Sequence, residues 1–239
     1  MGTLLFFSLQ CKRILRKYSP DMAKQKLIRF AALPGLANVR QDPGSLRGHW
    51  HSDFFHNDRP ITLELACGKG DYTLALAQRY PERNFIGIDI KGPRLWVGAT
   101  RALELGLTNA GFVRASIEQL GEYFAPGEIA VIWITFPDPH PAGGKHKKRL
   151  TSTRFLDLYQ LLLQPDGLLH LKTDDEGLYA FTLRILARRK AEVLASTPDL
   201  YSGPSDPDLT GIQTAYEQRH IKEGKRIKYI RFRLKAGRD

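Results

Sequence analysis

Cysteine is scarce in this chain: two occur among 239 residues, Cys11 in a basic leader and Cys67 in a glycine-containing segment. Two such thiols do not make a disulfide framework, and neither Cys nor His recurs at the spacing of a metal site. Disulfide-stapled secreted domains and zinc modules are therefore excluded as classes. We expect no metal cofactor, and we expect the reducing cytoplasm as the location.

Long apolar runs are also missing. Residues 4–9 are apolar, but a membrane span needs about 18 to 20 such residues. Basic residues follow this run instead of preceding it, which argues against a signal peptide. We expect no membrane partner, and we expect residues 1–22 to be a disordered leader or an over-long start that precedes the genuine one at Met22.

Acidic residues are outnumbered, with 25 Asp and Glu against 36 Lys and Arg and a formal net charge of +11. Such a balance favours a polyanionic partner, most often nucleic acid, although an ordinary basic enzyme is the alternative. The basic residues gather at two places, the loop 145–149 and the segment 219–233. A basic loop beside a candidate active site favours contact with substrate phosphates.

Short apolar runs alternate with amphipathic segments from residue 61 onward, and this alternation predicts an α/β domain with a mostly parallel sheet. Strands are expected at 61–66, 84–90, 111–114, 129–135, 168–173, 191–195 and 230–234. Helices are expected at 72–79, 93–105, 152–163 and 177–188, with a helical turn ending at 123. Residues 23–60 are basic and rich in Pro and Gly, and we expect them to form an arm that packs on the domain 61–239.

A glycine segment links the first predicted strand to the first predicted helix. Gly68 and Gly70 allow a sharp turn and a close approach to a ligand. A dinucleotide-binding fold would have a third glycine to hold a pyrophosphate, whereas Asp71 and Glu64 would repel phosphate here. The segment therefore suits a ligand with an ammonium group, such as S-adenosylmethionine. Asp89, about 20 residues further on, is placed to accept hydrogen bonds from ribose hydroxyls.

Asp138 stands between two prolines directly after the apolar run 129–135. Proline fixes φ, so this loop leaves the sheet stiffly, at the edge where open α/β sheets place their chemistry. A turn that merely ends the strand is the alternative. Asp174 ends the next predicted strand, and Tyr216 and Glu217 follow later. Carboxylates match the amino edge of guanine and tyrosine stacks on bases, so we expect a guanine-reading pocket within a basic surround.

The remaining histidines and tryptophans of interest carry no ligand spacing. His170 is expected to be packed within its strand, and His220 is expected to be solvated. Trp133 lies in an apolar run and is expected to belong to the core. Cys67 is expected to be a small packing residue, because no base lies near it in the sequence.

Six motifs together resemble the bacterial tRNA (guanine-N7)-methyltransferase family in order and spacing, and the stretches 84–92 and 132–136 look similar to its Bacteroidetes branch. The motifs are Glu64-Leu-Ala-Cys-Gly-Lys-Gly70, Gly87-Ile-Asp89, Phe136-Pro-Asp-Pro139, Lys147-Lys-Arg-Leu-Thr151, Lys172-Thr-Asp174 and Thr214-Ala-Tyr-Glu217. The resemblance spans residues 27–234. It implies an α/β class I S-adenosylmethionine-dependent methyltransferase, Rossmann-like, with a mostly parallel seven-stranded sheet, a reversed last strand and helices on both faces.

The resemblance also implies methyl transfer to N7 of guanosine 46 in the variable loop of tRNA, with a role for individual residues. Asp138 is expected to be the catalytic acid and a donor contact. The other donor contacts implied are Glu64, Gly68, Gly70, Asp89 and Ser116, the last where the family more often has an acid or amide. The substrate contacts implied are Asp174, Thr214, Tyr216, Glu217, Lys145, Lys147 and Arg149. Lys145 is the candidate to replace a family lysine that is absent at Ala142.

Guanine N7 carries a lone pair and no proton, so its methylation needs no strong base. Methyl transfer moves positive charge onto the ring, which Asp138 and Asp174 would stabilise. A methyltransferase of exocyclic nitrogen is the alternative enzyme, but it typically has Asn-Pro-Pro or Asp-Pro-Pro in this loop. A non-catalytic RNA-binding protein is the alternative of another class, and the intact glycine segment argues against it. The sequence leaves open whether the chain is a monomer or a homodimer.

Overall fold

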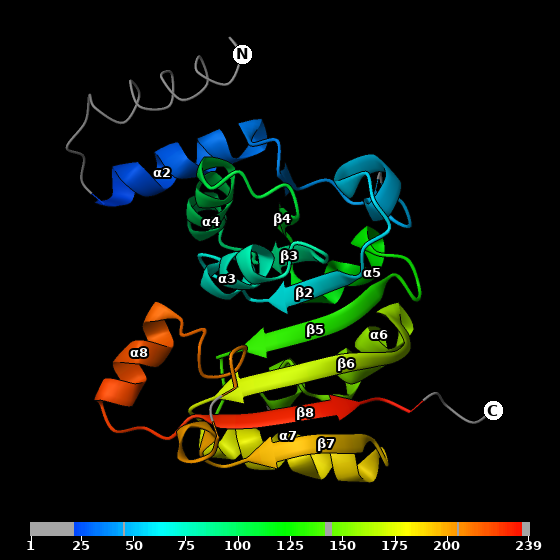
Figure 1. The fold of residues 1–239 in the computed structure, drawn as a ribbon, viewed down its shortest axis with the longest axis vertical. Coiled ribbons are helices and arrows are strands. Elements are labelled where there is room, and N and C mark those ends of the chain that lie inside the picture. The colour runs from blue at the N-terminus through cyan, green and yellow to red at the C-terminus, as the bar shows by residue number, and fades with distance from the viewer. Residues whose placement is uncertain (1–21, 45, 142–144, 205, 236–239) are drawn as a thin grey trace.

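The computed structural model describes residues 22–44, 46–141, 145–204 and 206–235. Its centre is one eight-stranded sheet in the order β1-β4-β3-β2-β5-β6-β8-β7 (Figure 1). The strands are β1 Val39–Arg40, β2 Ile61–Leu65, β3 Asn84–Ile88, β4 Ala110–Val113, β5 Ile129–Thr135, β6 Leu163–Thr173, β7 Glu192–Thr197 and β8 Lys228–Arg233. The α-helices are α2 Met22–Ala32, α3 Asp71–Arg79, α4 Gly92–Glu104, α5 Leu120–Tyr123, α6 Thr153–Leu162, α7 Glu176–Arg188 and α8 Ala215–Lys222. The prediction for residues 1–21 lies outside the described residues.

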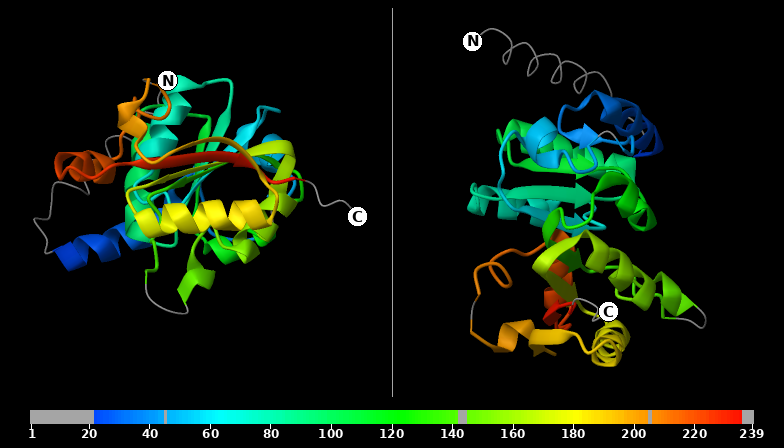
Figure 2. Two further views of the ribbon diagram at one scale, coloured as in Figure 1. Left: turned by 90° about the horizontal axis from the view of Figure 1, so that it is seen from below. Right: turned by 90° about the vertical axis from the view of Figure 1, so that its right-hand side faces the viewer.

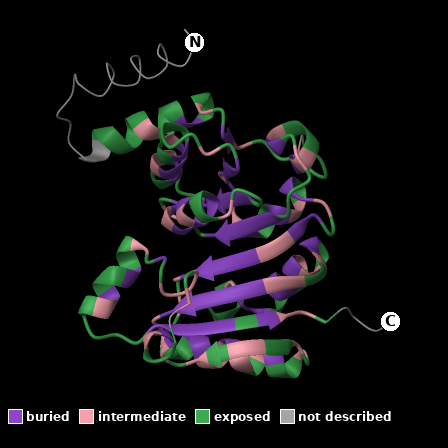
Figure 3. Ribbon diagram, viewed as in Figure 1, coloured by how far each residue is buried: buried purple, intermediate pink, exposed green. Residues whose placement is uncertain are grey.

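The sheet is parallel from β1 to β6 and antiparallel at its other edge. β8 pairs with both β6 and β7 in the antiparallel sense, so the expected reversed last strand is confirmed. β2 and β3 are buried along their whole length, which is typical of central strands covered on both faces (Figure 3). The carboxyl ends of β2, β5 and β6 therefore meet at one edge, and α8 lies beside that edge in Figure 1.

Helices cover both faces of the sheet, as expected (Figure 2). The buried residues of α5, α6 and α7 join one hydrophobic cluster, around Leu63, Ile132 and Phe232. The buried residues of α3 and α4 join a second cluster on the other face, which also contains Trp133. Each helix thus turns one apolar stripe to the sheet, and Trp133 is a core residue as predicted.

The arm is more regular than its composition suggests. It contains α2, which packs against α4, and the short strand β1, which adds an eighth strand to the seven expected. Val39 of β1 stands opposite Phe112 of β4, and the Phe112 amide donates to the Asn38 carbonyl. Residues 23–32 are rich in helix formers and contain no proline, so a helix there is consistent with local propensity.

The strand β6 begins five residues earlier than predicted. The pair Asp166-Gly167 is typical of a turn and predicts the end of the helix 152–163, but α6 already ends at Leu162 and this pair lies within β6. Opposite it, Ile129 of β5 pairs with Leu163, and Val131 pairs with Leu168, so the turn residues form an irregularity inside the strand. Asp166 has φ of 62°, a value that aspartate tolerates better than most residues.

Candidate active site

The glycine segment connects β2 to α3, and its backbone at Lys69 packs against Gly98 of α4. Gly68 and Gly70 have φ of 60° and 69°, and so does Ala66, the residue that follows β2, with φ of 57°. A Cβ atom on Gly70 would stand 2.7 Å from the ring of Phe112, so a larger residue would push the segment off the sheet. The backbone is thus held close to the sheet at the point where a ligand would approach it.

Asp89 fixes this segment from the neighbouring strand. It follows β3, is buried, and accepts hydrogen bonds from the Gly68 amide at 2.8 Å and the Lys91 amide at 2.7 Å. Each carboxylate oxygen keeps a second lone pair for another donor. The structure therefore brings together Gly68 and Asp89, which are 21 residues apart in sequence.

Glu64 lies beneath the segment, near the end of β2, and is 3% exposed. Its carboxylate accepts hydrogen bonds from the backbone amide and hydroxyl of Thr73, and from the hydroxyl of Thr135 at 2.8 Å. Burial raises the pKa of Glu64 to about 7, even though these hydrogen bonds oppose the shift. Within the described part of the chain no Lys or Arg forms an ion pair with it.

Ser116 follows β4 at the same edge of the sheet. It caps the short helix Ile117–Gln119, and its hydroxyl donates to the side-chain oxygen of Gln119 at 3.0 Å. The two side chains form a reciprocal capping box that fixes the loop. Ser116 therefore has a local structural role, and a donor contact would be additional to it.

Asp138 stands on a sharply turned loop after β5. Phe136 and His140, on either side of it, have φ of 48° and 43°, which is uncommon outside glycine. The side chain of Asp138 is 72% exposed, and its carboxylate accepts a hydrogen bond from the His140 amide at 3.1 Å. Left-handed residues of this kind occur where the surroundings impose them, often at functional sites.

Arg149 holds that loop from below. It is 4% exposed, its Nε donates to the carbonyl of Pro139 at 2.8 Å, and its guanidinium stands 4.5 Å from the ring centre of Phe181. The charged group thus points into the protein, and the expected phosphate contact of Arg149 stays a prediction. Sequence alone does not separate the buried Arg149 from the exposed Lys145 and Lys147 beside it.

Asp174 and Tyr216 meet across the edge of the sheet. The hydroxyl of Tyr216 is 3.5 Å from Oδ1 of Asp174, and its ring is 5.3 Å from the ring of Phe136. Asp174 Oδ2 lies 3.0 Å from Nδ1 of His220. His220 is 5% exposed and stacks on Tyr216 at 4.0 Å, so the prediction that it is solvated was wrong.

Glu217 points away from this edge. It is completely buried and forms an ion pair with Lys172 at 2.7 Å, and its expected substrate contact stays a prediction. Thr214 caps α8 by accepting a hydrogen bond from the Glu217 amide at 3.1 Å. Sequence reasoning missed Lys172, although a lysine flanked by Leu171 in an apolar strand was a usable signal.

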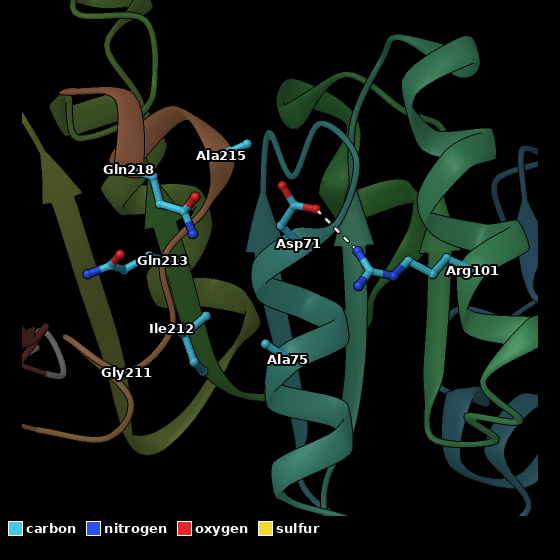
Figure 4. A pocket seen from close by; sticks show the side chains of 8 residues that line it. All are labelled: Asp71, Ala75, Arg101, Gly211, Ile212, Gln213, Ala215 and Gln218. Atoms are coloured by element: carbon cyan, nitrogen blue, oxygen red, sulfur yellow. Dashed lines mark ion pairs between the residues drawn. The ribbon is translucent and has the colours of Figure 1, made fainter. Parts of the chain in front are cut away.

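An open pocket of about 440 Å³ lies between α3 and the segment 211–218 (Figure 4). Asp71, next to the glycine segment, lines it and faces Arg101 at 3.9 Å. Gln213, Ala215 and Gln218 line the opposite wall. The pocket thus lies between the start of α3, which follows the glycine segment, and the start of α8, which carries Tyr216.

Neither a metal centre nor a membrane span is found among the described residues. They contain no group of three or more His, Cys, Asp or Glu side chains arranged to hold a metal ion. Among the same residues, no helix is both long enough and apolar enough to cross a membrane.

The fold is shared with solved rRNA methyltransferases. The 16S rRNA methyltransferase KamB superposes with a TM-score of 0.59, covering 77% of this chain and 92% of its own, at 13% identity. A variant of the 16S rRNA (adenine(1408)-N(1))-methyltransferase from Catenulisporales acidiphilia, solved with its cosubstrate SAM, gives 0.57 over 79% and 91%, at 16% identity. Identities this low show the fold alone, which is that of the class I methyltransferases.

Closer relatives define the family. Residues 58–230 match the model of a family described as "Putative methyltransferase". The tRNA (guanine-N(7)-)-methyltransferase of Porphyromonas gingivalis is 52% identical over 190 residues, which cover 79% of this chain and 77% of the relative. That of Christiangramia forsetii is 46% identical over 222 residues, covering 89% and 99%. The chain belongs to the bacterial tRNA (guanine-N7)-methyltransferase family, as its six motifs predicted.

Proposed function

We propose that this protein transfers a methyl group from S-adenosylmethionine to N7 of guanosine 46 in the variable loop of tRNA. The observation that carries the proposal is the 52% identity to a tRNA (guanine-N(7)-)-methyltransferase over most of the chain. The positions of Gly68, Asp89, Asp138 and Asp174, each of which follows the carboxyl end of one of four neighbouring parallel strands, support it. We place the reaction in the cytoplasm, where tRNA is the polyanion that matches the basic charge.

The donor is proposed to lie over the glycine segment. Gly68 and Gly70 allow close approach, Asp89 accepts from the ribose hydroxyls, and Ser116 and Asp138 border the same edge. Glu64 is a buried carboxylate without an ion-pair partner in the described chain, and its pKa is raised to about 7 by burial. An ammonium group nearby would favour the ionised form of Glu64, which suits the amino acid tail of this donor.

The guanosine is proposed to enter between Asp138 and Tyr216. Tyr216 is 41% exposed and gives its ring to stack on the base, while Asp174 accepts from the amino edge of guanine. N7 attacks the methyl carbon with its lone pair, the carbon–sulfur bond breaks, and its electron pair stays on sulfur. Asp138 stabilises the positive charge that develops on the ring.

The RNA backbone is proposed to contact Lys145 and Lys147, which are exposed on the short helix Lys145–Lys148 after the Asp138 loop. Arg149 supports that loop, and Thr214 caps α8. Glu217 is internal to the protein in this structure. We therefore propose a substrate surface that lacks Arg149 and Glu217 and is smaller than the sequence motifs imply.

The proposed function is tested by incubating the protein with labelled S-adenosylmethionine and an unmodified tRNA. Borohydride reduction followed by aniline cleaves RNA at 7-methylguanosine, and we expect a single cleavage at position 46. A tRNA with adenosine at that position is the matched control and should accept no label. Label without aniline cleavage would identify a different target atom, such as an exocyclic nitrogen, and would contradict the proposal.

A further inference from the structure

Lys172 is a completely buried cation in the middle of the sheet. It lies near the end of β6, two residues before Asp174, and its side chain has no exposed area. Its ammonium group donates to the carbonyl of Leu209 at 2.7 Å and to the carboxylate of Glu217, with a longer contact of 3.4 Å to the Ile212 carbonyl. All three donors of the ammonium thus face acceptors from one segment.

That segment, residues 206–217, is here named the strap. It connects the region after β7 to α8 and carries Thr214 and the start of α8. At its far end the hydroxyl of Tyr80 donates to Asp208 at 2.6 Å, and Tyr72 donates to the Asp208 carbonyl. The strap is therefore tied to α3 through Asp208 and to β6 through Lys172.

Both oxygens of the Glu217 carboxylate have partners within the protein. Besides Lys172 it accepts a hydrogen bond from the Tyr201 hydroxyl at 2.9 Å. Glu217 is fully buried, so no substrate atom reaches it in this arrangement. Its neighbour Tyr216 points the other way, toward Asp174 and Phe136.

Burying a lysine and a glutamate together gains little stability, because both lose their hydration and apolar residues of the same size often serve as well. Burial also lowers the pKa of Lys172, which Glu217 partly offsets. Unlike an apolar pair, a hydrogen-bonded charged pair holds its two side chains in one relative orientation. The Lys172–Glu217 pair therefore fixes the orientation of the first turn of α8 relative to β6.

We propose that Lys172 is a positioning residue, which holds the strap on the sheet through Glu217 so that Tyr216 stands beside Asp174 at the guanosine site. This inference rests on the proposed function, and it adds to that function a residue that touches neither donor nor RNA. Lys172 connects the strand that directly precedes Asp174 to the first turn of the helix that contains Tyr216. The Lys172–Glu217 contact thus fixes the position of Tyr216 relative to Asp174 on the two sides of the proposed base site.

The test compares Lys172→Met with the double variant Lys172→Met/Glu217→Leu. The single variant leaves Glu217 buried and unpaired, so it should lower the melting temperature, and the double variant should recover most of it. We expect kcat/KM for tRNA to fall at least tenfold in both variants, while the donor Kd, measured by calorimetry, changes less than twofold. Amide hydrogen exchange of residues 209–217 should be at least tenfold faster in both.

Glu128→Gln is the matched control. Glu128 is also a buried charge, accepting hydrogen bonds from the Trp50 and Ala125 amides, but it lies at the amino end of β5, away from the site. This variant should lower the melting temperature with unchanged kcat/KM. Glu217→Gln keeps the size of the side chain and one acceptor oxygen. It tests the positioning role if Lys172→Met does not fold, and we expect its kcat/KM for tRNA to fall three- to tenfold.

A double variant that regains wild-type kcat/KM together with its melting temperature would reduce Lys172 to a stabilising residue and overturn the proposal. Wild-type kinetics in a folded Lys172→Met or Glu217→Gln protein would do the same. Failure of the proposed function is a separate result, because the wild-type protein would then not methylate tRNA. Hydrogen exchange of the strap would still report whether Lys172 holds it.

Discussion

At the scale of single residues, Asp138 and Glu64 show two ways of placing a carboxylate at the same edge. Asp138 is exposed and held by its loop, whereas Glu64 is buried and held by two threonines. An exposed carboxylate keeps its hydration, so it costs the fold little. A buried one affects stability as soon as it ionises.

Asp138→Ala is expected to lower kcat for tRNA methylation about 100-fold, because it removes the carboxylate that we propose to stabilise the developing positive charge. Stability should change by less than about 0.5 kcal/mol, since the side chain is exposed and accepts one hydrogen bond, from His140. Kinetics and thermal unfolding measure the two effects. Glu104→Ala, an exposed acid on α4, is the control, and wild-type turnover by a folded Asp138→Ala protein would exclude this role.

Glu64→Gln is expected to change how stability depends on pH. The pKa of Glu64 is raised to about 7 in the folded protein by burial, so the folded state holds the proton more tightly than the unfolded state does. Stability from this group is therefore present below pH 4.5 and lost as pH rises through about 7. Relative to the Gln variant, the wild type should lose up to about 3 kcal/mol across that range.

Urea unfolding at several pH values measures this difference. Other groups cancel when the two proteins are compared, including His170, whose pKa burial lowers to about 3. A difference that does not vary between pH 4.5 and 7.5 would show that Glu64 ionises as freely in the folded protein as in the unfolded chain.

At the scale of elements, the loop after β5 depends on a residue that looked like a surface cation. Arg149→Ala removes the hydrogen bond to the Pro139 carbonyl and the contact with Phe181, so we expect kcat to fall about tenfold as Asp138 loses its fixed position. The salt dependence of tRNA binding should not change. Lys148→Ala, in the same turn and exposed, is the control for kcat. A flatter salt dependence of tRNA binding in Arg149→Ala would mean that Arg149 contacts RNA phosphates.

Among the elements, the sequence predicted several helices and strands well, but it did not predict the burial of individual charged residues. Periodicity and turn residues predicted β2, α3 and β5 within about two residues, because local patterns determine these elements. Burial of Arg149, Glu217 and His220 was not predictable in this way. Each of these side chains is buried against a partner that is distant in the sequence: Pro139 for Arg149, Lys172 for Glu217 and Asp174 for His220. The sequence alone does not show which charged residue has such a partner.

At the scale of the whole molecule, the charge of +11 is expected to act through tRNA binding. Lys145→Ala and Lys147→Ala should each weaken tRNA binding several-fold and lower the slope of log Kd against log salt by about 1, because each lysine that contacts a phosphate releases about one counterion. Filter binding between 50 and 300 mM salt measures both. Lys190→Ala, an exposed lysine at the end of α7, is the control. Unchanged slopes in both lysine variants would place the RNA elsewhere.

The order of the strands largely separates two sets of proposed site residues. Most residues proposed to bind the donor lie in or follow β2, β3 and β4, and those proposed to read the base follow β5 and β6 or belong to α8, while Asp138 after β5 serves both. The two tasks therefore occupy two halves of a continuous sheet that meet at β5. Substitutions in the half that reads the base can therefore change the RNA target, while the half that binds the methyl donor stays the same. The same division makes hybrid proteins, joined between β4 and β5, a practical route to new RNA targets.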